Sequence, residues 1–193
     1  MPLKGRRAGS EAITDWIANF GMVPKEYGPG WVHQGFLWQF EEQQNDLNTH
    51  LDALTKGGVN DILITGHSLG GALSWLATYY IKNRYPSANV EIISFAAPSA
   101  TSHGFLNWIY ERVPHRNHIV NGMDTVTCVP PGYTEQGQIR HYTAEWQIVW
   151  WGWNTWFDSR KHSCWTCLAV WDHMMNHYCN AVGAGPSGCP AAF

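Results

Sequence analysis

A Gly-x-Ser-x-Gly turn between two apolar segments constrains this chain more than any other feature of its sequence. Residues 66–70 read Gly-His-Ser-Leu-Gly, with a predicted buried strand over 59–65, centred on Ile62-Leu63-Ile64, before them and a helical pattern over 69–85 after them. A serine in such a tight strand-to-helix turn projects its hydroxyl above the sheet, and glycines flank it where strand and helix approach closely. The motif therefore predicts an exposed nucleophile, Ser68, on an α/β scaffold.

Strand and helix patterns alternate along the chain, which is typical of a mostly parallel sheet in an α/β fold. The predicted elements in chain order are a helix over 11–20, a helix ending near Leu54, a strand over 59–65, a helix over 69–85, a strand over 90–95, a helix over 103–113, a strand over 118–121, a strand over 145–151 and a helix over 165–182. No repeat, low-complexity run or linker interrupts the pattern. A single domain over residues 1–193 is therefore expected.

The composition argues against several classes of protein. Only 14% of the 193 residues are charged, against about 25% in ordinary chains, so a disordered tail protein is not expected. The 12 Lys and Arg are scattered and form no basic stripe, which argues against a nucleic-acid binder. No run approaches the ~20 apolar residues of a membrane span, and residues 1–7 lead into no signal-peptide core.

A serine nucleophile needs a base, and the base needs an orienting acid. In this architecture the acid follows the serine along the chain and the histidine comes last. Three aspartates follow Ser68: Asp124, Asp158 and Asp172. Asp124 comes directly after the predicted strand 118–121, where the ligand-facing groups of a parallel sheet gather, so it is the predicted acid.

The base must then come from the later histidines, which are His141, His162, His173 and His177. His173 opens an aromatic-flanked segment that can fold back over the sheet edge, which makes it a candidate base. His177, one helical turn further on, is its serious competitor.

The five cysteines leave the redox state and metal content of the C-terminal region open. An odd number leaves at least one thiol unpaired within the monomer, and four of the five come after residue 160. The spacings Cys164-x-x-Cys167 and His173-x-x-x-His177 resemble zinc ligands, but only five residues separate the two pairs, against about a dozen in a zinc finger. Structural zinc, a disulfide and buried free thiols are all compatible with this pattern.

In six ordered segments the chain resembles the class 3 (fungal-type) triacylglycerol lipases and feruloyl esterases of the α/β-hydrolase fold. The segments are Ala8 to Asn19, Val32-His33-Gln34-Gly35-Phe36, Gly66 to Ala72, Phe95-Ala96-Ala97-Pro98, Asn121 to Val126 with Pro130-Pro131, and Asp172-His173 with Tyr178. The stretch from Gly66 to Ala72 is the most specific of them. The resemblance implies a mostly parallel central sheet with helices on both faces.

The resemblance also implies roles for individual residues. Ser68 is then the nucleophile, Asp124 the acid and His173 the base. The oxyanion hole is expected from the backbone N–H of Leu69 and from Ser10, which can also cap the helix that follows it. Residues expected to contact substrate are Trp16, Ile17, Phe20 and His67. No cofactor or catalytic metal is implied.

The helix over 11–20 has an apolar face formed by Ile13, Trp16, Ile17 and Phe20. It is expected either to form a lid that turns onto a lipid surface or to pack permanently on the core. The implied activity is that of a serine carboxylester hydrolase acting on triacylglycerol or another long-chain acyl ester. Alternatives are a feruloyl or acetyl esterase on plant polysaccharide, or an impaired, aromatic-rich binding homologue, because seven of the 12 Trp lie within residues 146–171. Secretion is what the resemblance implies.

The beginning of the chain departs from the family pattern. Residues 3–10 are too short and too charged for the buried strand that precedes the oxyanion residue in the family, with Arg7 and Ala8 in place of Phe and Arg. Without that strand, 59–65 has an unpaired edge. We expect a truncated N-terminus, completion of the sheet by another segment or by a second copy of the chain, or a lower stability.

Overall fold

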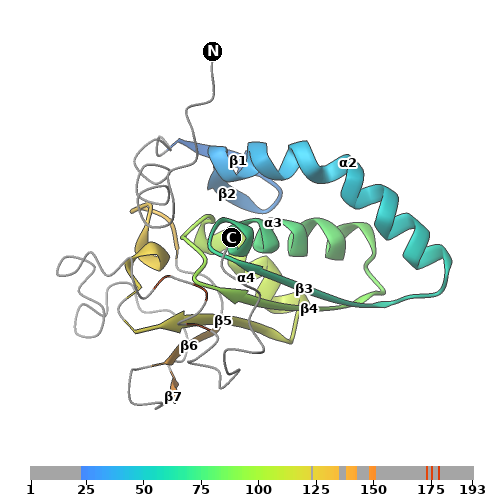
Figure 1. The fold of residues 1–193 in the computed structure, drawn as a ribbon. Coiled ribbons are helices and arrows are strands. Elements are labelled where there is room, and N and C mark those ends of the chain that lie inside the picture. Colours follow the sequence, from blue (N-terminus) through green and yellow to red (C-terminus); the bar gives the residue numbers. More distant parts are fainter. Residues whose placement is uncertain are drawn as a thin grey trace, which may run out of the picture.

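The structure is a computed structural model that describes residues 23–122, 124–134, 138–142, 148–150, 173, 175 and 178. Figure 1 shows its elements, which in chain order are β1 (Pro24–Tyr27), β2 (Gly30–His33), α2 (Gln34–Lys56), β3 (Asp61–His67), α3 (Leu69–Arg84), β4 (Asn89–Phe95), α4 (His103–Arg112), β5 (Arg116–Asn121), the 3₁₀ turn η1 (Thr125–Cys128), β6 (Gln138–Tyr142) and β7 (Ile148–Trp150). No helix in these ranges has the length and apolarity needed to cross a bilayer.

The central sheet has the strand order β3-β4-β5-β6-β7. The pairings β3–β4, β4–β5 and β5–β6 are parallel, and only β6–β7 is antiparallel. β1 and β2 form a separate antiparallel pair. Helices α3 and α4 connect the successive parallel strands, so the predicted α/β class is confirmed. Within the described ranges no strand pairs with the outer edge of β3.

One face of the sheet lies beneath the helices. Ile92 of β4 belongs to a buried core that it shares with the apolar side chains of α2, α3 and α4 (Figure 1). Trp75 of α3 is fully buried in this core and its indole Nε1–H donates to Ser94 Oγ at 3.0 Å. A buried indole thus satisfies its only donor across the helix–sheet boundary.

The opposite face is covered by residues far away in the chain. Because successive strand residues point to opposite faces, Ile93 and Phe95 face away from Ile92. They pack with Ile119 against Met175 and Tyr178, which both have helical conformation. Further along the same face Leu63 of β3 is 61% exposed. In the part of the chain that the structure describes, this face is therefore covered at the carboxyl ends of the strands, whereas Leu63, nearer the amino end of β3, is exposed.

β3, at the edge of the central sheet, begins at Asp61, two residues after the start predicted from the sequence. Val59 N–H donates to Leu54 O, and Gly58 N–H donates to Thr55 O, so the end of α2 still holds residue 59. β3 consequently covers Asp61–His67, and both Val59, inside the predicted strand, and Leu54 are exposed. The backbone competition at the helix end outweighs the apolar pattern.

Other differences concern elements that the sequence hides. Gly30–His33 forms a strand before α2 instead of a simple lead-in to the helix, and β6 was not predicted at all. β7 lies inside the predicted strand 145–151. The predicted helix over 11–20 lies outside the described residues, as does most of the predicted helix over 165–182.

Candidate active site

Ser68 lies in a sharp turn between β3 and α3. Its φ of 55° and ψ of −124° are unusual for a residue other than glycine. Its N–H donates to Phe95 O at 3.0 Å, so the neighbouring strand β4 holds the turn in place. Such a strained, supported backbone is what the strand–turn–helix motif requires to lift a serine hydroxyl above the sheet.

The glycines around Ser68 differ in what they do. A Cβ at Gly66 would lie 2.2 Å from Gly70 O, and a Cβ at Gly71 would lie 2.8 Å from Ala97 Cβ. A Cβ at Gly70 would meet no atom within 4 Å in the part of the chain that the structure describes. Close packing of strand and helix therefore requires Gly66 and Gly71, whereas the second glycine of the motif, Gly70, is not required for it.

The structure brings Ser68, His173 and Asp124 together in one hydrogen-bonded chain. His173 Nε2 lies 2.7 Å from Ser68 Oγ, and His173 Nδ1 lies 2.9 Å from Asp124 Oδ2 and 3.1 Å from Oδ1. Because a carboxylate only accepts, Nδ1 carries the proton and Nε2 is free to accept the serine hydroxyl proton. His173 and Asp124 are both buried. This arrangement is that of an acid, a base and a nucleophile in series.

Asp124 is held by two further hydrogen bonds. Val126 N–H donates to Asp124 Oδ1 at 2.9 Å, in the first turn of η1. The Tyr178 hydroxyl donates to Asp124 Oδ2 at 2.6 Å and accepts the Asn121 N–H at 3.0 Å. The buried carboxylate thus has a backbone, a hydroxyl and an imidazole donor, which satisfies a charge that would otherwise be costly to bury.

The sequence analysis did not assign Tyr178 to the site. Its signal was present, because Tyr178 closes the terminal segment that begins at Asp172-His173. The spacing between His173 and Tyr178 does not by itself indicate a role for the tyrosine, and its contact with Asp124 forms only when the chain folds. Only the placement of residues 173 and 178 on the sheet brings the hydroxyl to the carboxylate.

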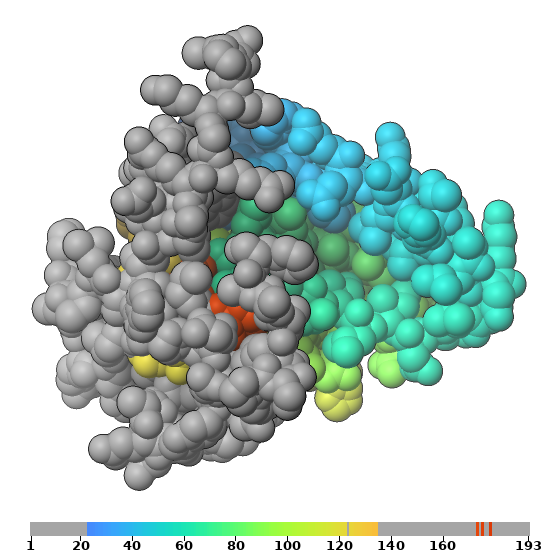
Figure 2. Space-filling view, viewed as in Figure 1, coloured from blue at the N-terminus to red at the C-terminus, as the bar shows by residue number. Residues whose placement is uncertain are grey.

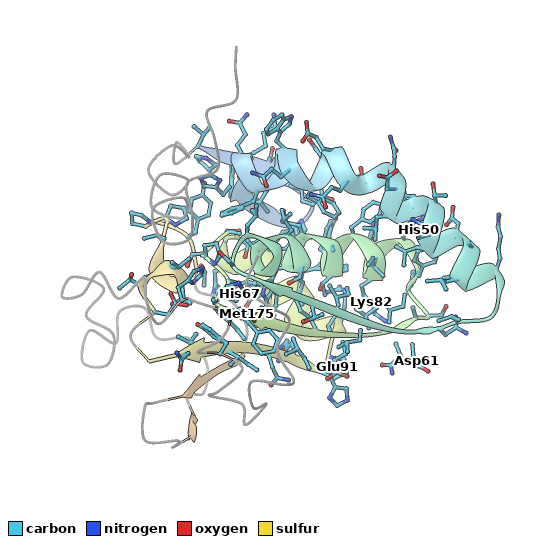
Figure 3. All side chains as sticks on the ribbon, viewed as in Figure 1. His50, Asp61, His67, Lys82, Glu91 and Met175 are labelled. Carbon is cyan, nitrogen blue, oxygen red and sulfur yellow. The ribbon has the colours of Figure 1, made fainter. Side chains whose placement is uncertain are left out.

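The side chain of His67 contacts the segment that carries the base. Its Nε2 lies 2.8 Å from the backbone oxygen of His173 and its ring packs against His173 and Tyr178. Its expected contact with substrate stays a prediction. Figure 3 labels His67 at the carboxyl end of β3, in the same part of the view as Met175. In Figure 2 the described C-terminal residues, in red, reach the surface beside green atoms of the middle of the chain. Burial, followed by the charge interaction with His173, lowers the pKa of His67 from 6.5 to about 4.

Leu69 is the first residue of α3, directly after Ser68. The first N–H groups of a helix have no acceptor within it, and the helix dipole there favours negative charge. The other expected oxyanion residue, Ser10, lies outside the described residues, as do the expected substrate contacts Trp16, Ile17 and Phe20.

Asp158, Asp172, His162 and His177 are outside the described residues, and His141 is described only as part of the β6 backbone.

The structure describes the bonding state of one cysteine. Cys128, at the end of the turn that Asp124 caps, is disulfide-bonded. The other four cysteines lie outside the described residues. Within the described ranges no group of three or more His, Cys, Asp or Glu side chains is arranged to hold a metal ion.

Comparison with known proteins gives one family. The model of the family described as Lipase (class 3) matches residues 6–134. A lipase from Rhizomucor miehei is 33% identical over 141 residues, which are 67% of this chain and 39% of that protein. The secreted mono- and diacylglycerol lipase 1 of Fusarium solani is 30% identical over 129 residues, which are 64% of this chain and 38% of that protein.

A solved structure extends the comparison to three dimensions. In that protein, a triacylglycerol lipase, a serine protease triad forms the catalytic centre. It is 30% identical to this chain, with a TM-score of 0.60 over 70% of this chain and 54% of the other. The expected α/β-hydrolase fold is thereby confirmed.

The match does not cover everything that the site contains. This chain spans about two fifths of the length of these two curated relatives. The family match includes Ser68 and Asp124 but ends before His173 and Tyr178. The contacts of these two residues therefore come from the folded structure alone.

Proposed function

The chain belongs to the class 3 lipase family, and on that premise we propose that it is a serine carboxylester hydrolase that cleaves acyl esters through an acyl-enzyme at Ser68. The observation that carries the proposal is the hydrogen-bonded chain from Ser68 Oγ through His173 to Asp124. A neutral serine is a weak nucleophile, and this chain provides the base and the orienting acid that it needs.

The proposed reaction runs in two halves. Ser68 Oγ attacks the ester carbonyl carbon while His173 Nε2 takes the hydroxyl proton, and the proton then passes to the leaving alkoxide as the C–O bond breaks. Water attacks the acyl-serine ester in the same way, with His173 again as base and then as acid. Asp124 keeps the proton on Nδ1 and stabilises the imidazolium that forms in each half.

The developing oxyanion needs donors that are fixed before the reaction begins. We propose the Leu69 N–H as one of them, because it starts α3 next to Ser68 and lies at the positive end of the helix dipole. Ser10 is proposed as the second donor on the family resemblance alone. One such donor is worth about 10²–10³ in kcat in enzymes where it has been removed.

Long-chain acyl esters, such as acylglycerols, are the proposed substrates. The family and the two lipases described above support this choice, since one of them is a mono- and diacylglycerol lipase. Residues 11–20, with Trp16, Ile17 and Phe20, are the proposed lipid-contacting segment. Their apolar stripe is the sequence feature behind this part of the proposal.

The outer edge of β3 suggests a protein partner. The strand is seven residues long, and no described strand pairs with its outer edge. Such an edge offers unpaired backbone groups to another strand. We propose that a second copy of the chain or a further segment of the protein pairs there. Sedimentation velocity distinguishes the two, because a second copy makes the sedimentation coefficient rise with concentration and an intramolecular strand does not.

A fluorophosphonate probe tests the proposed activity. We expect it to label the wild-type protein and Ser87→Ala, an exposed serine control, and to leave Ser68→Ala unlabelled. Hydrolysis of p-nitrophenyl esters of increasing chain length then measures the acyl preference, which we expect to favour long chains. A folded wild-type protein that takes no label is a binding or impaired homologue. A preference for acetyl or feruloyl esters assigns the protein to the acetyl or feruloyl esterases instead.

A further inference from the structure

His67 lies next to the nucleophile, and its half-buried imidazole takes no part in the proposed reaction. It is the last residue of β3, and Ser68 follows it directly. Its Nε2 lies 2.8 Å from the backbone oxygen of His173. A carbonyl oxygen only accepts, so Nε2 carries the proton and donates it. The side chain beside the nucleophile therefore binds the main chain of the base, 106 residues away in the sequence.

The ring of His67 is held on two further sides. Its centroid lies 4.9 Å from that of the His173 ring, with an angle of 37° between the planes. The Tyr178 ring lies 5.6 Å away at 73°, an edge-to-face contact. Both distances are within the usual range for paired aromatic rings. The imidazole thus packs against the two residues whose side chains donate to Asp124, and its hydrogen bond has a fixed direction.

We propose, on the basis of the proposed function, that His67 is a positioning residue whose Nε2–H holds the His173 backbone in register with Ser68. The two ring hydrogen bonds of His173 set the rotation of its imidazole and do not act on its main chain. The bond from His67 fixes the carbonyl of His173 to the residue that precedes the nucleophile. A displacement of about 1 Å in such a constellation costs roughly 10²-fold in rate.

The charges around His67 fit this role. The groups that face it are His173, Asp124 and the Tyr178 hydroxyl, which donates to Asp124. His173 becomes a cation in each half of the proposed reaction, and a second cation 4.9 Å away would oppose it. The low pKa of His67, about 4, keeps its ring neutral under ordinary conditions. It can therefore donate a hydrogen bond to His173 without adding a competing charge.

Two substitutions separate the hydrogen bond from the ring. His67→Phe keeps an aromatic ring but removes the donor, and His67→Gln removes the ring but places an amide N–H near the position of Nε2. We expect His67→Phe to lower kcat on a soluble p-nitrophenyl ester by 10- to 10²-fold with KM within about twofold. We expect His67→Gln to recover most of that loss. His50→Phe, an exposed histidine on α2, is the matched control.

A second readout follows the geometry without turnover. The proton on His173 Nδ1, which donates to Asp124, gives a low-field proton NMR signal that is expected to be lost or shifted in His67→Phe and retained in His67→Gln. If His67→Phe does not fold, His67→Asn takes its place, because its amide is one carbon shorter than that of Gln and does not reach the His173 carbonyl. The comparison then lies between two amides of the same chemistry.

The outcomes are distinct. A loss in His67→Phe that His67→Gln restores supports the proposal. Wild-type kcat in His67→Phe overturns it, and so does an equal loss in both variants, which would assign the effect to ring packing. Probe labelling of the wild type that depends on Ser68 is established first. If this labelling is absent, the proposed function fails, and that result does not depend on the His67 variants.

Discussion

On one face of the sheet Ile92 and Ser94 lie beneath α3, and on the other Ile93 and Phe95 lie beneath Met175 and Tyr178. The first face is covered by α2, α3 and α4, helices that are close to the strands in the sequence. Within the described residues, the second is covered at the carboxyl ends of the strands by residues that follow β5 by more than fifty positions.

The two faces differ in what they contribute. Among the described residues, the helix-covered face holds most of the large, fully buried apolar side chains, including Trp75, Phe36 and Phe105, and so contributes most of their hydrophobic stabilisation. The other face carries the site, since His67 and Phe95 point to it and His173 and Tyr178 pack on it. Substitutions on the first face should therefore lower stability, and those on the second should lower activity with smaller changes in stability.

The largest effect is expected from Asp124→Asn on the site face. An amide offers an N–H₂ where the carboxylate accepts, so the Nδ1–H of His173 or the Tyr178 hydroxyl loses its acceptor and the neutral histidine is driven to the wrong tautomer. We expect kcat to fall by ~10⁴. Asp46→Asn on the exposed side of α2 is the control. An activity within tenfold of wild type would mean that Asp124 does not orient the base.

The next effect is expected from Leu76→Ala on the helix-covered face. Leu76 is fully buried in the core shared by α2, α3 and α4. Its truncation should lower the free energy of unfolding by about 2–5 kcal/mol, through lost burial and the cavity left behind. Urea unfolding measures this loss. The comparison of faces fails if the loss is no greater than that of Leu63→Ala, described below.

A pH effect of intermediate size is expected from His67. Its pKa is about 4 in the folded protein and 6.5 in the unfolded chain, so between these values only the unfolded chain binds the proton. The free energy of unfolding should therefore fall as the pH drops from 6.5 to 4, by at most about 3 kcal/mol.

His67→Gln should remove this part of the slope, and His50→Gln should leave it in place. The measurement is urea unfolding at pH 7, 5.5 and 4.5. Parallel slopes for wild type and His67→Gln would show that the imidazole is solvated and titrates normally.

A smaller effect is expected from Tyr178→Phe. The change removes the hydroxyl that joins Asn121 N–H to Asp124 and leaves a buried N–H without its acceptor. We expect a loss of stability of about 1–3 kcal/mol, together with a roughly tenfold lower kcat. Tyr79→Phe, in the aromatic cluster of the helix-covered face, is the control. Unchanged activity in Tyr178→Phe would restrict the hydroxyl to a packing role.

The smallest effect is expected from Leu63→Ala, at the open end of the site face. Leu63 is 61% exposed, so its truncation should change the free energy of unfolding by less than about 0.5 kcal/mol. Leu63→Ala and Leu76→Ala are the same leucine-to-alanine change, made once on each face of the sheet. A loss above 1.5 kcal/mol would show that this end of the sheet is covered in solution, as pairing at the β3 edge would produce.

Local patterns in the sequence predicted the helix-covered face and the turn at Ser68. The β3–α3 turn and the strand ends that place Asp124 follow from residues within a few positions of one another. α3 is an exception. Its buried residues, Trp75, Ser74 and Thr78 among them, lie on several sides of the helix, so no single apolar stripe in the sequence marks its inner face.

Features that depend on distant segments were not predictable in the same way. β6, Gln138–Tyr142, has few apolar residues, and its place is fixed by pairing with β5 and β7. The choice of His173 over His177 came from a resemblance, and nothing local to either histidine distinguishes them. The contacts of Tyr178 with Asp124 and of His67 with His173 join segments about 50 and 106 residues apart, a distance at which no periodic pattern operates.

Because side chains alternate along β3, the position of each residue in the strand decides on which face of the sheet its side chain lies. An extra residue between Asp61 and His67 would turn the side chain of residue 67 toward the helices and bring its neighbour to the site face. The same insertion at residues 57–60 would only lengthen a surface connection. Natural or engineered length variation in this protein should therefore collect before Asp61 and stop abruptly there, and an insertion scan across residues 57–67 would show the boundary as a single step.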